Sequence, residues 1–293
     1  MLKKYKKGIT VFTPTYNRCN TLPRLYDSLK NQYDKNFEWL IIDDGSIDDT
    51  KKVVDNFIKE KEINIRYIFQ ENHGKSYAFN VGVENASYNL FYCVDSDDYI
   101  GEDTIKIIND INNVIMDDDK IVGIMGYKKN IRKNYKNHRS IKENVLTVSQ
   151  LYRRYHFKDE IALLYKTSLL IDNPFPIIDG EKFMPESYLY DKMDVIGKCY
   201  FIKENIYFYE YLEDGYTNNS AELLKNNVNG YILYSKNRME NSILWENKLK
   251  GAVQYNISNL IAGKGLKYLR SKYFLLLIIT LIPSYLYYLK KYK

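Results

Sequence analysis

The sequence predicts an α/β protein with a mostly parallel central sheet and a helical extension at its C-terminal end. Strand-like and helix-like segments alternate over the first hundred residues, and a helical pattern begins at about Asn218. An alternation of this kind gives a parallel sheet with right-handed crossovers and helices on both faces. We expect a first domain over residues 1–215 and a helical region over residues 216–293, with an apolar tail at about residues 270–293.

The strand-like segments are short apolar runs that end in polar turns, and the helix-like segments carry apolar residues at helical spacing. Thr21 with Pro23 favours one helix start, and Asp48 with Asp49 favours another. The expected order is strand 9–17, helix 21–32, strand 37–46, helix 48–60, strand 63–70, helix 74–86 and strand 88–98. A helix over residues 104–117 and the strand-like segments KIVGIMGY, KCYFI and NIYFYEYL follow.

The composition is that of a folded globular protein, with 45% apolar and 27% charged residues in a chain of 293. Its three cysteines form no CxxC pair and its three histidines no HExxH pattern, which argues against a zinc or redox site. The net charge of +6 is dispersed without arginine-rich tracts, so we expect no nucleic-acid partner. The apolar run near the N-terminus is too short for a secretory signal, which favours the cytoplasm.

Polar residues follow each of the four strands expected in the first hundred residues. The clusters are Thr13–Asn17, Asp43–Ser46, Gln70–Lys75 and Asp95–Asp98. Ligands of open parallel sheets bind outside the carboxyl ends of the strands, where these clusters lie. The four clusters together predict one binding site at that edge.

Three carboxylates fall within four positions in the segment DSDD, residues 95–98. Like charges this close cost free energy unless a cation or hydrogen bonds offset them. One explanation is Mg²⁺ or Mn²⁺ held by one or two carboxylates and completed by substrate phosphates. The alternative is a helix cap, in which Asp97 or Asp98 caps a helix that starts near Asp103.

The other clusters offer groups that suit a nucleotide. Tyr16 can stack on a base, and Asp44 can accept the N3 hydrogen of a uracil ring. The alternative for IDDGS is a strand-to-helix turn with capping side chains. Because the chain has no GxxxxGK[ST] and no GxGxxG motif, phosphate charge has to be met by a metal and by side chains such as Lys75.

Four motifs in this order resemble the family 2 glycosyltransferases of the GT-A fold: VFTPTYNR, LIIDDGSIDDT, QENHGKSYAFNVGVENA and YCVDSDDYI. The resemblance covers about the first 105 residues and continues more weakly through Pro185–Met193. It implies transfer of a sugar, with inversion at the anomeric carbon, from a nucleotide-diphosphate donor that is most often UDP-linked.

The resemblance also assigns roles to residues. DSDD corresponds to the family's DXD motif, with Asp97 as the direct metal ligand and Asp95 near the ribose or the metal. Asp44 corresponds to the aspartate that recognises the base. The residues assigned to the donor nucleotide are Pro14, Thr15, Tyr16, Asn17, Arg18, Asp44, Lys75, Asp95 and Ser96.

An inverting transfer needs a carboxylate that takes the proton from the attacking hydroxyl. In the family this base lies in an ED-type motif at the start of a helix after the sheet, and PESYLYDKM aligns Glu186 with it. This chain has Glu-Ser where Glu-Asp is common, so Asp191 and Glu181 stay open as alternatives. A solvated glutamate at a helix start is the structural alternative.

The chain closes with an apolar stretch from Tyr273 to Leu289. As a helix it measures roughly 25 Å, against about 30 Å of bilayer hydrocarbon, and Pro283 interrupts it. Basic flanks and tyrosines favour an interfacial membrane anchor. A partner or homo-oligomer interface and an ordinary buried helix are the alternatives. EYLEDGYTNN, residues 210–219, is either a lid over the site or a connecting loop.

These observations predict a bacterial, inverting glycosyltransferase that uses Mn²⁺ or Mg²⁺ at the inner face of the cytoplasmic membrane. We expect a lipid-linked or polymeric glycan acceptor in capsule, exopolysaccharide or cell-wall synthesis. One rival is a sugar-phosphate nucleotidyltransferase, which usually carries a glycine-rich, basic N-terminal loop that is absent here. The other is a catalytically inactive subunit that binds glycans or serves as a scaffold.

Overall fold

The computed structural model describes residues 5–132, 141–210 and 220–293. The chain divides into two compact units. The first unit consists of Met1–Pro174 and Gly197–Tyr211, and the second of Phe175–Ile196 and Leu212–Lys293. A segment that carries the candidate base Glu186 therefore groups with the C-terminal helices. The functional boundary at residues 215 and 216 stays a prediction.

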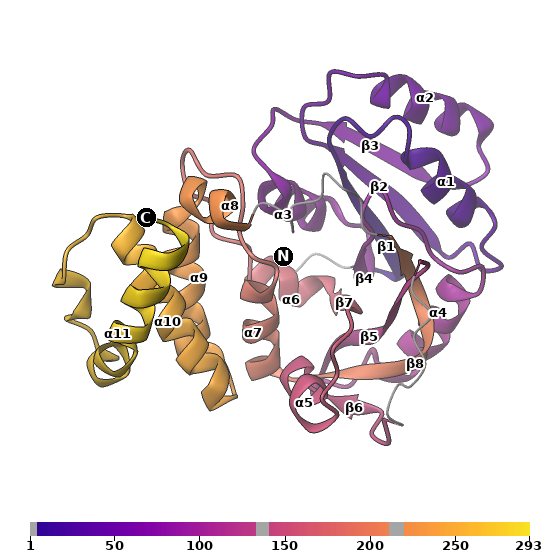
Figure 1. The fold of residues 1–293 in the computed structure, drawn as a ribbon. Coiled ribbons are helices and arrows are strands. Elements are labelled where there is room, and N and C mark those ends of the chain that lie inside the picture. Colours follow the sequence, from indigo (N-terminus) through magenta and orange to yellow (C-terminus); the bar gives the residue numbers. More distant parts are fainter. Residues whose placement is uncertain (1–4, 133–140, 211–219) are drawn as a thin grey trace. The chain divides into compact units, whose positions relative to one another are not determined.

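The first unit is an eight-stranded sheet with helices on both faces (Figure 1). Its sheet has the strand order β3-β2-β1-β4-β7-β5-β8-β6, in which β7 is antiparallel to both of its neighbours and β6 is antiparallel to β8. The other adjacent pairs are parallel, so the predicted mostly parallel sheet is confirmed. The strands are β1 (Lys6–Thr15), β2 (Phe37–Asp43), β3 (Ile65–Phe69), β4 (Tyr88–Cys93), β5 (Ile121–Asn130), β6 (Val145–Leu146), β7 (Ile161–Lys166) and β8 (Lys198–Tyr209).

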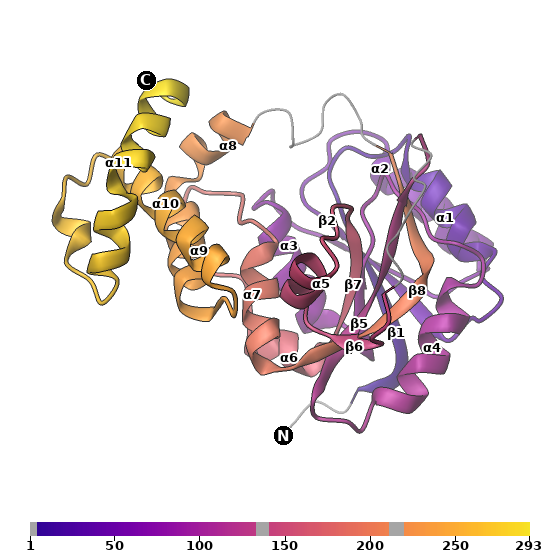
Figure 2. The same cartoon turned by 60° about the horizontal axis from the view of Figure 1, so that its bottom comes forward.

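The helices of the first unit cover the sheet with their buried side chains, which on several of them form an apolar stripe at helical spacing. α1 buries Leu22, Leu25, Tyr26 and Leu29 at helical spacing. Helices α1, α2 and α4 lie on one side of the sheet, and α3 and α6 lie on the other (Figure 2). The bounds are α1 (Leu22–Lys30), α2 (Thr50–Glu60), α3 (Lys75–Asn85), α4 (Thr104–Ile115), α5 (Val148–Arg154) and α6 (Thr167–Asp172).

Close contact on the α3 face depends on a glycine. A Cβ atom added at Gly82 would come within 2.6 Å of ring carbons of Phe12 and within 3.2 Å of Phe91. The rings of Phe12 and Phe91 stack at 5.0 Å, and Phe79 of α3 packs edge-on against both. Only a residue without a side chain lets α3 approach this aromatic cluster, and α3 begins at the carboxyl ends of the strands.

Strand β8 joins two segments that the sequence pattern separates, KCYFI and NIYFYEYL. It pairs with β5 along its length, and the pairing shifts register between Gly126 and Tyr127 and again between Tyr127 and Lys128. Such irregularities absorb extra residues and bend a strand. The C-terminal end of β8 then reaches the residues after β4, where Tyr99 and Phe208 form an antiparallel bridge.

The second unit is helical from residue 187 onward apart from its connections. Its helices are α7 (Ser187–Ile196), α8 (Ser220–Asn226), α9 (Val228–Asn241), α10 (Trp245–Ile261), the short 3₁₀ helix η2 (Lys267–Leu269) and α11 (Phe274–Lys291). Small and polar side chains are buried among these helices, including Ser235, Asn256 and Thr280. The predicted helical C-terminal region is therefore confirmed for its described residues.

Candidate active site

The loops after β1 and β2 are locked together at the carboxyl edge of the sheet. Asn17 adopts a left-handed conformation, with φ 52°. Its backbone N–H donates to Ser46 Oγ at 2.8 Å, and its Oδ1 accepts from the N–H of Ile47 at 2.9 Å. Arg18 follows, with its N–H 3.0 Å from Thr50 Oγ1. Asn17 therefore shapes this edge, and its predicted contact with a nucleotide is untested.

The residues expected to form a base pocket lie at the end of β1. Pro14 and Thr15 belong to the strand, where they pair with Ile42 and Asp43 of β2. Tyr16, the next residue, leaves the sheet with 48% of its surface exposed. An exposed ring at this edge is available for stacking on a planar ligand.

Two carboxylates of IDDGSIDDT serve the turn that leads from β2 to α2. Asp43 Oδ1 accepts from the N–H of Ser46 at 2.8 Å, and Asp48 Oδ1 accepts from the N–H of Thr50 at 3.0 Å. Burial opposes ionisation of Asp48, but hydrogen bonds from Thr50 and Cys19 lower its pKa to about 2. The turn-forming alternative for IDDGS thus holds for Asp43, and Asp48, just after the motif, stabilises the next part of the turn.

Asp44 instead organises the loop before α3. Its Oδ1 accepts from the side-chain amide of Gln70 at 2.7 Å and from the N–H of His73 at 2.9 Å. Its Oδ2 accepts from the N–H of Gly74 at 2.7 Å. Asp44 is 5% exposed, and these three bonds leave about one of its four acceptor positions for a ligand. The sequence pattern gave no sign of this loop-holding role.

Lys75 and Asp95 face each other across the carboxyl ends of the strands. Lys75 is the first residue of α3, and its Nζ lies 2.7 Å from Asp95 Oδ1. Both side chains are about one-third exposed. The N-terminus of a helix favours anions, so a cation, an anion-attracting helix end and a carboxylate meet here.

The DSDD segment is a turn in which exposure alternates. Asp95 and Asp97 are partly exposed, whereas Ser96 and Asp98 are buried. The N–H of Asp98 donates to the carbonyl oxygen of Asp95 at 3.1 Å and closes the turn. The alternation separates two accessible carboxylates from two residues that face the protein.

Asp98 is held by β8 and caps no helix. Tyr207 Oη donates to Asp98 Oδ2 at 2.7 Å and accepts from the N–H of Asp95 at 3.0 Å. Burial, with the charge of Asp95 nearby, raises the pKa of Asp98 to about 7. The residue at the N-cap of α4 is Asp103, so the capping explanation of Asp97 and Asp98 is wrong. The turn is fixed by a strand more than a hundred residues away.

Arg24 of α1 also contacts the DSDD turn, a contact that no sequence motif predicts. Its Nη2 donates to the carbonyl oxygen of Asp97, and its Nη1 lies 2.6 Å from Glu210 Oε1. The hydrogen bond from Arg24 lowers the pKa of Glu210. Residues 211–219, the rest of the segment considered as a lid, lie outside the described residues.

The three candidate bases differ in their surroundings within the second unit. Glu186 is exposed, and its Oε2 accepts from Tyr190 Oη at 2.8 Å. Asp191 is buried, with one oxygen 3.4 Å from Arg238 Nε. Glu181 caps α9 by accepting from the N–H groups of Asn229 and Gly230 at 2.8 and 2.6 Å. Of the three, Glu186 is the one presented to solvent.

The sequence model of the family described as glycosyl transferase family 2 matches residues 10–174, more than half of the chain. The chain belongs to this family. The resemblance carried by its four motifs is thereby confirmed, and the matched range contains every candidate residue described above for the sheet edge of the first unit.

Individual relatives match over shorter ranges. The poly-β-1,6-N-acetyl-D-glucosamine synthase of Staphylococcus aureus strain MSSA476 is 38% identical over 101 residues, which are 33% of this chain and 23% of the relative. Among the curated relatives compared, the matched part is less than a quarter of their own length.

Solved structures agree with the GT-A fold of the family. The S. aureus TarS fragment 1–349 in complex with UDP-GlcNAc gives a TM-score of 0.65 at 19% identity, covering 94% of this chain and 80% of that one. The mannosyltransferase PcManGT of Pyrobaculum calidifontis, in complex with GDP-Man and Mn²⁺, gives 0.57 at 15% identity, covering 99% and 89%. At these identities the likeness establishes the fold.

The donor set for a divalent metal in this family member is small. Within residues 5–132, 141–210 and 220–293, no group of three or more His, Cys, Asp or Glu side chains converges. Asp95 and Asp97 are accessible, and they are hard oxygen donors. Mg²⁺ and related cations use one or two carboxylates together with substrate phosphates and water, so the residues present fit such an ion.

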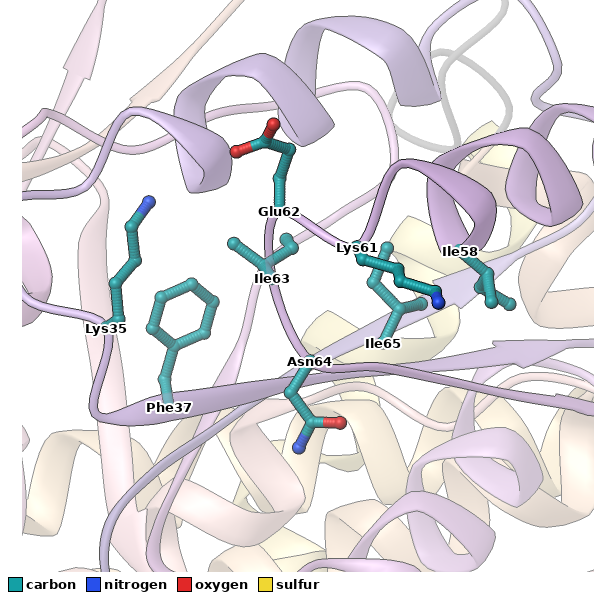
Figure 3. Close-up of a pocket in the computed structure, with 8 residues that line it drawn as sticks. All are labelled: Lys35, Phe37, Ile58, Lys61, Glu62, Ile63, Asn64 and Ile65. Atoms are coloured by element: carbon teal, nitrogen blue, oxygen red, sulfur yellow. The ribbon is translucent and has the colours of Figure 1, made fainter.

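A cavity of about 500 Å³ lies away from this edge (Figure 3). Phe37, which begins β2, and Ile65, which begins β3, line it together with Lys61 after α2. It is therefore at the amino ends of the strands. Ligands of parallel sheets bind at the opposite ends, which separates this cavity from the candidate active site.

Proposed function

We propose that the protein is an inverting, metal-dependent glycosyltransferase that moves a hexosyl or N-acetylhexosaminyl group from a nucleotide-diphosphate sugar to a hydroxyl group. The donor is a UDP-sugar. The observation that carries the proposal is the pair of accessible carboxylates, Asp95 and Asp97, of which Asp95 contacts Lys75 at the N-terminus of α3. The bound UDP-GlcNAc of the TarS structure supports the class of donor.

Each part of the donor has a complementary group at this edge. Tyr16 offers a ring to the base, and Asp44 offers its remaining acceptor position to a ring N–H, with Pro14 and Thr15 beside them. Lys75 can release Asp95 and turn to a phosphate, because both groups are accessible. Asp97 and Asp95 would hold Mn²⁺ or Mg²⁺, which supplies charge neutralisation for the departing diphosphate.

Glu186 is the proposed general base. A general base has to be reachable by the acceptor hydroxyl, and Glu186 is exposed at the start of α7. Asp191 is buried against Arg238, and Glu181 is used as a helix cap. Tyr190 donates to Glu186 Oε2 at 2.8 Å, which orients the carboxylate at the start of α7.

The acceptor is a lipid-linked or polymeric glycan of a capsule, exopolysaccharide or cell wall, and the enzyme works at the inner membrane face. The polysaccharide synthase relative supports a polymeric product. Among the described residues, α11 is the one helix long and apolar enough to cross a membrane by length and composition, and 17% of that window is buried.

The burial pattern of α11 supports a membrane contact. Its buried residues are Leu277, Thr280 and Ser284, and Asn256 of α10 donates to Thr280 Oγ1 at 3.0 Å. Large apolar side chains face outward instead: Phe274, Leu275, Ile278, Ile279, Ile282 and Leu286. Helices in lipid place small and polar side chains at helix–helix contacts and apolar side chains on the outward face. Surface helices of soluble proteins place apolar side chains inward and polar ones outward. Lysines at both ends suit anionic headgroups.

A vesicle experiment tests the membrane contact. The double change Ile279→Asn and Leu286→Asn should weaken sedimentation with phosphatidylglycerol-containing vesicles by on the order of tenfold, because each change removes buried apolar area. Leu233→Asn, at an exposed position on α9, is the matched control. Equal sedimentation of all three chains would refute the membrane contact and leave the sugar transfer standing.

A thermal-shift screen of nucleotide sugars with and without Mn²⁺ tests the main proposal. A UDP-sugar should raise the melting temperature only with the metal, and the effect should vanish in Asp97→Ala. Release of UDP on addition of a glycan acceptor would exclude an inactive scaffold. Consumption of a nucleoside triphosphate and a sugar phosphate, with release of inorganic diphosphate, would instead establish the nucleotidyltransferase.

A further inference from the structure

Arg24 joins three segments of the first unit that are distant in sequence. From α1, its guanidinium donates through Nη2 to the carbonyl oxygen of Asp97 and through Nη1 to Glu210, at 2.6 Å. Its guanidinium carbon lies 5.3 Å from the centre of the Tyr99 ring. The side chain is 36% exposed, so it reaches the turn from a partly covered position.

Glu210 balances the charge of Arg24. Its Oε1 accepts from Arg24, and its Oε2 accepts from Arg132 Nε at 2.8 Å. An ionised carboxylate between two guanidinium groups forms the strong class of hydrogen bond. A metal cation held by Asp97 would therefore lie near an Arg24 side chain whose positive charge is balanced by Glu210.

The geometry points to Arg24 as a positioning residue for the turn that carries Asp95 and Asp97. This role rests on the proposed metal-dependent transfer. Tyr207 holds the N–H of Asp95 at one end of the turn, and Arg24 holds the carbonyl of Asp97 at the other. Fixing both backbone groups restricts where the two accessible carboxylates point, and outer contacts of this kind tune the affinity of a metal site.

A direct contact with donor phosphate is the competing role for Arg24. Both terminal nitrogens of its guanidinium already face acceptors of this chain, a carbonyl and a carboxylate. The two roles predict different results. Loss of a positioning residue lowers the affinity for the metal, and a saturating metal concentration then restores nucleotide binding. Loss of a phosphate contact weakens nucleotide binding at every metal concentration.

The test measures UDP binding to the full chain by calorimetry over a series of Mn²⁺ concentrations. In Arg24→Gln, the Mn²⁺ concentration for half-maximal UDP binding should rise by about tenfold or more. At saturating Mn²⁺, the UDP affinity should return to within about threefold of the unaltered chain. Lys30→Gln, which removes a different cation from α1, should change neither value. Arg24→Lys should also raise the Mn²⁺ requirement, because an ammonium group cannot reproduce the two-pronged contact.

Each outcome is decisive. An unchanged Mn²⁺ requirement in a folded Arg24→Gln chain would overturn the positioning role, and so would a loss of UDP affinity that saturating Mn²⁺ does not restore. If Arg24→Gln does not fold, Glu210→Gln provides the same test, with the same direction expected. If the unaltered chain binds no UDP with Mn²⁺, the proposed function fails and takes this role with it.

Discussion

The carboxyl edge of the sheet and the C-terminal helices use polar side chains in opposite ways. At the sheet edge, the side chains of Asp44 and Asp98 are buried and accept hydrogen bonds that hold the loops. Asp95 and Asp97 stay partly exposed beside them. Around α10 and α11, Asn256 and Thr280 are buried between helices while apolar side chains face outward. The first arrangement leaves charged groups accessible at the sheet edge, and the second leaves apolar side chains exposed.

This difference teaches that exposure, more than residue type, distinguishes the carboxylates proposed to contact a metal or an acceptor from those that hold the fold, while the buried Asp44 is proposed to do both. Asp95, Asp97 and Glu186 are at least partly exposed. Asp98 and Asp191 are buried and paired with Tyr207 and Arg238. Substitution of a buried, hydrogen-bonded carboxylate should lower the stability of the protein. Substitution of an accessible carboxylate in the candidate site should lower its activity instead.

The largest effect is expected at Asp97. Asp97→Asn should lower kcat/KM for sugar transfer by about 10³-fold or more, equivalent to about 4 kcal/mol of transition-state stabilisation, because a neutral amide is a poor ligand for a hard cation. The melting temperature should hardly change. Asp110→Asn, at an exposed position on α4, is the control. Steady-state kinetics over a range of Mn²⁺ check the prediction, and near-normal activity of Asp97→Asn would contradict the metal role.

The next effect is expected at Glu186. Glu186→Gln should lower kcat by about 10²- to 10⁴-fold, the usual contribution of a general base. UDP binding with Mn²⁺ should stay within about twofold of the unaltered chain, which separates proton transfer from donor binding. Asp179→Asn, also exposed in the second unit, is the control. Unimpaired turnover of Glu186→Gln would remove that residue from the mechanism.

The sheet edge could be predicted from the sequence because each part is local. Each of the first four strands is followed within a few residues by its own polar turn, so their parallel topology alone brings the four clusters together. The contacts that fix this edge are not local. Tyr207 binds Asp98 across 109 positions, and Arg24 binds Asp97 across 73, and no periodicity links such pairs.

The same reasoning explains why the sequence pattern does not decide among the three candidate bases. Glu181 lies 48 positions before Asn229, from whose N–H it accepts a hydrogen bond, so its capping role depends on tertiary packing. Asp191 and Glu186 lie five positions apart around the start of one helix, and a pattern alone does not say which of them faces solvent. Burial in the folded unit decides that question.

Alanine substitutions at two glycines, Gly82 and Gly251, compare how tightly the two regions are packed. Gly82→Ala should cost about 1–3 kcal/mol, because its Cβ would lie 2.6 Å from Phe12 in a filled aromatic core. Gly251→Ala on α10 should cost less, since its Cβ would meet Ser235 O and Met239 Cγ at the longer distances of 3.1 and 3.2 Å. Both glycines lie inside helices, so the gain of about 1 kcal/mol in helix propensity applies to both variants. Thermal melting of both variants checks the order. A larger loss in Gly251→Ala would show that the helices are the more tightly packed region.

The smallest effect concerns the pH dependence of the second unit. Burial raises the pKa of Asp191 from 3.8 to about 6, against the opposing charge of Arg238 and with the support of Asp194. The folded chain therefore holds this proton more tightly than the unfolded chain does. Asp191 contributes stability that is fully present below about pH 4 and is lost as the pH rises towards about 6.

The corresponding variant is Asp191→Asn, which cannot titrate. Between pH 4.5 and pH 7, the unaltered chain should lose about 1–2 kcal/mol more stability than Asp191→Asn does, after allowance for relaxation around Arg238. Chemical unfolding at the two pH values, followed through the helical signal, measures this difference. Parallel pH dependence in the two chains would show that Asp191 is already ionised in the fold. Its contact with Arg238 at 3.4 Å would then be a full ion pair.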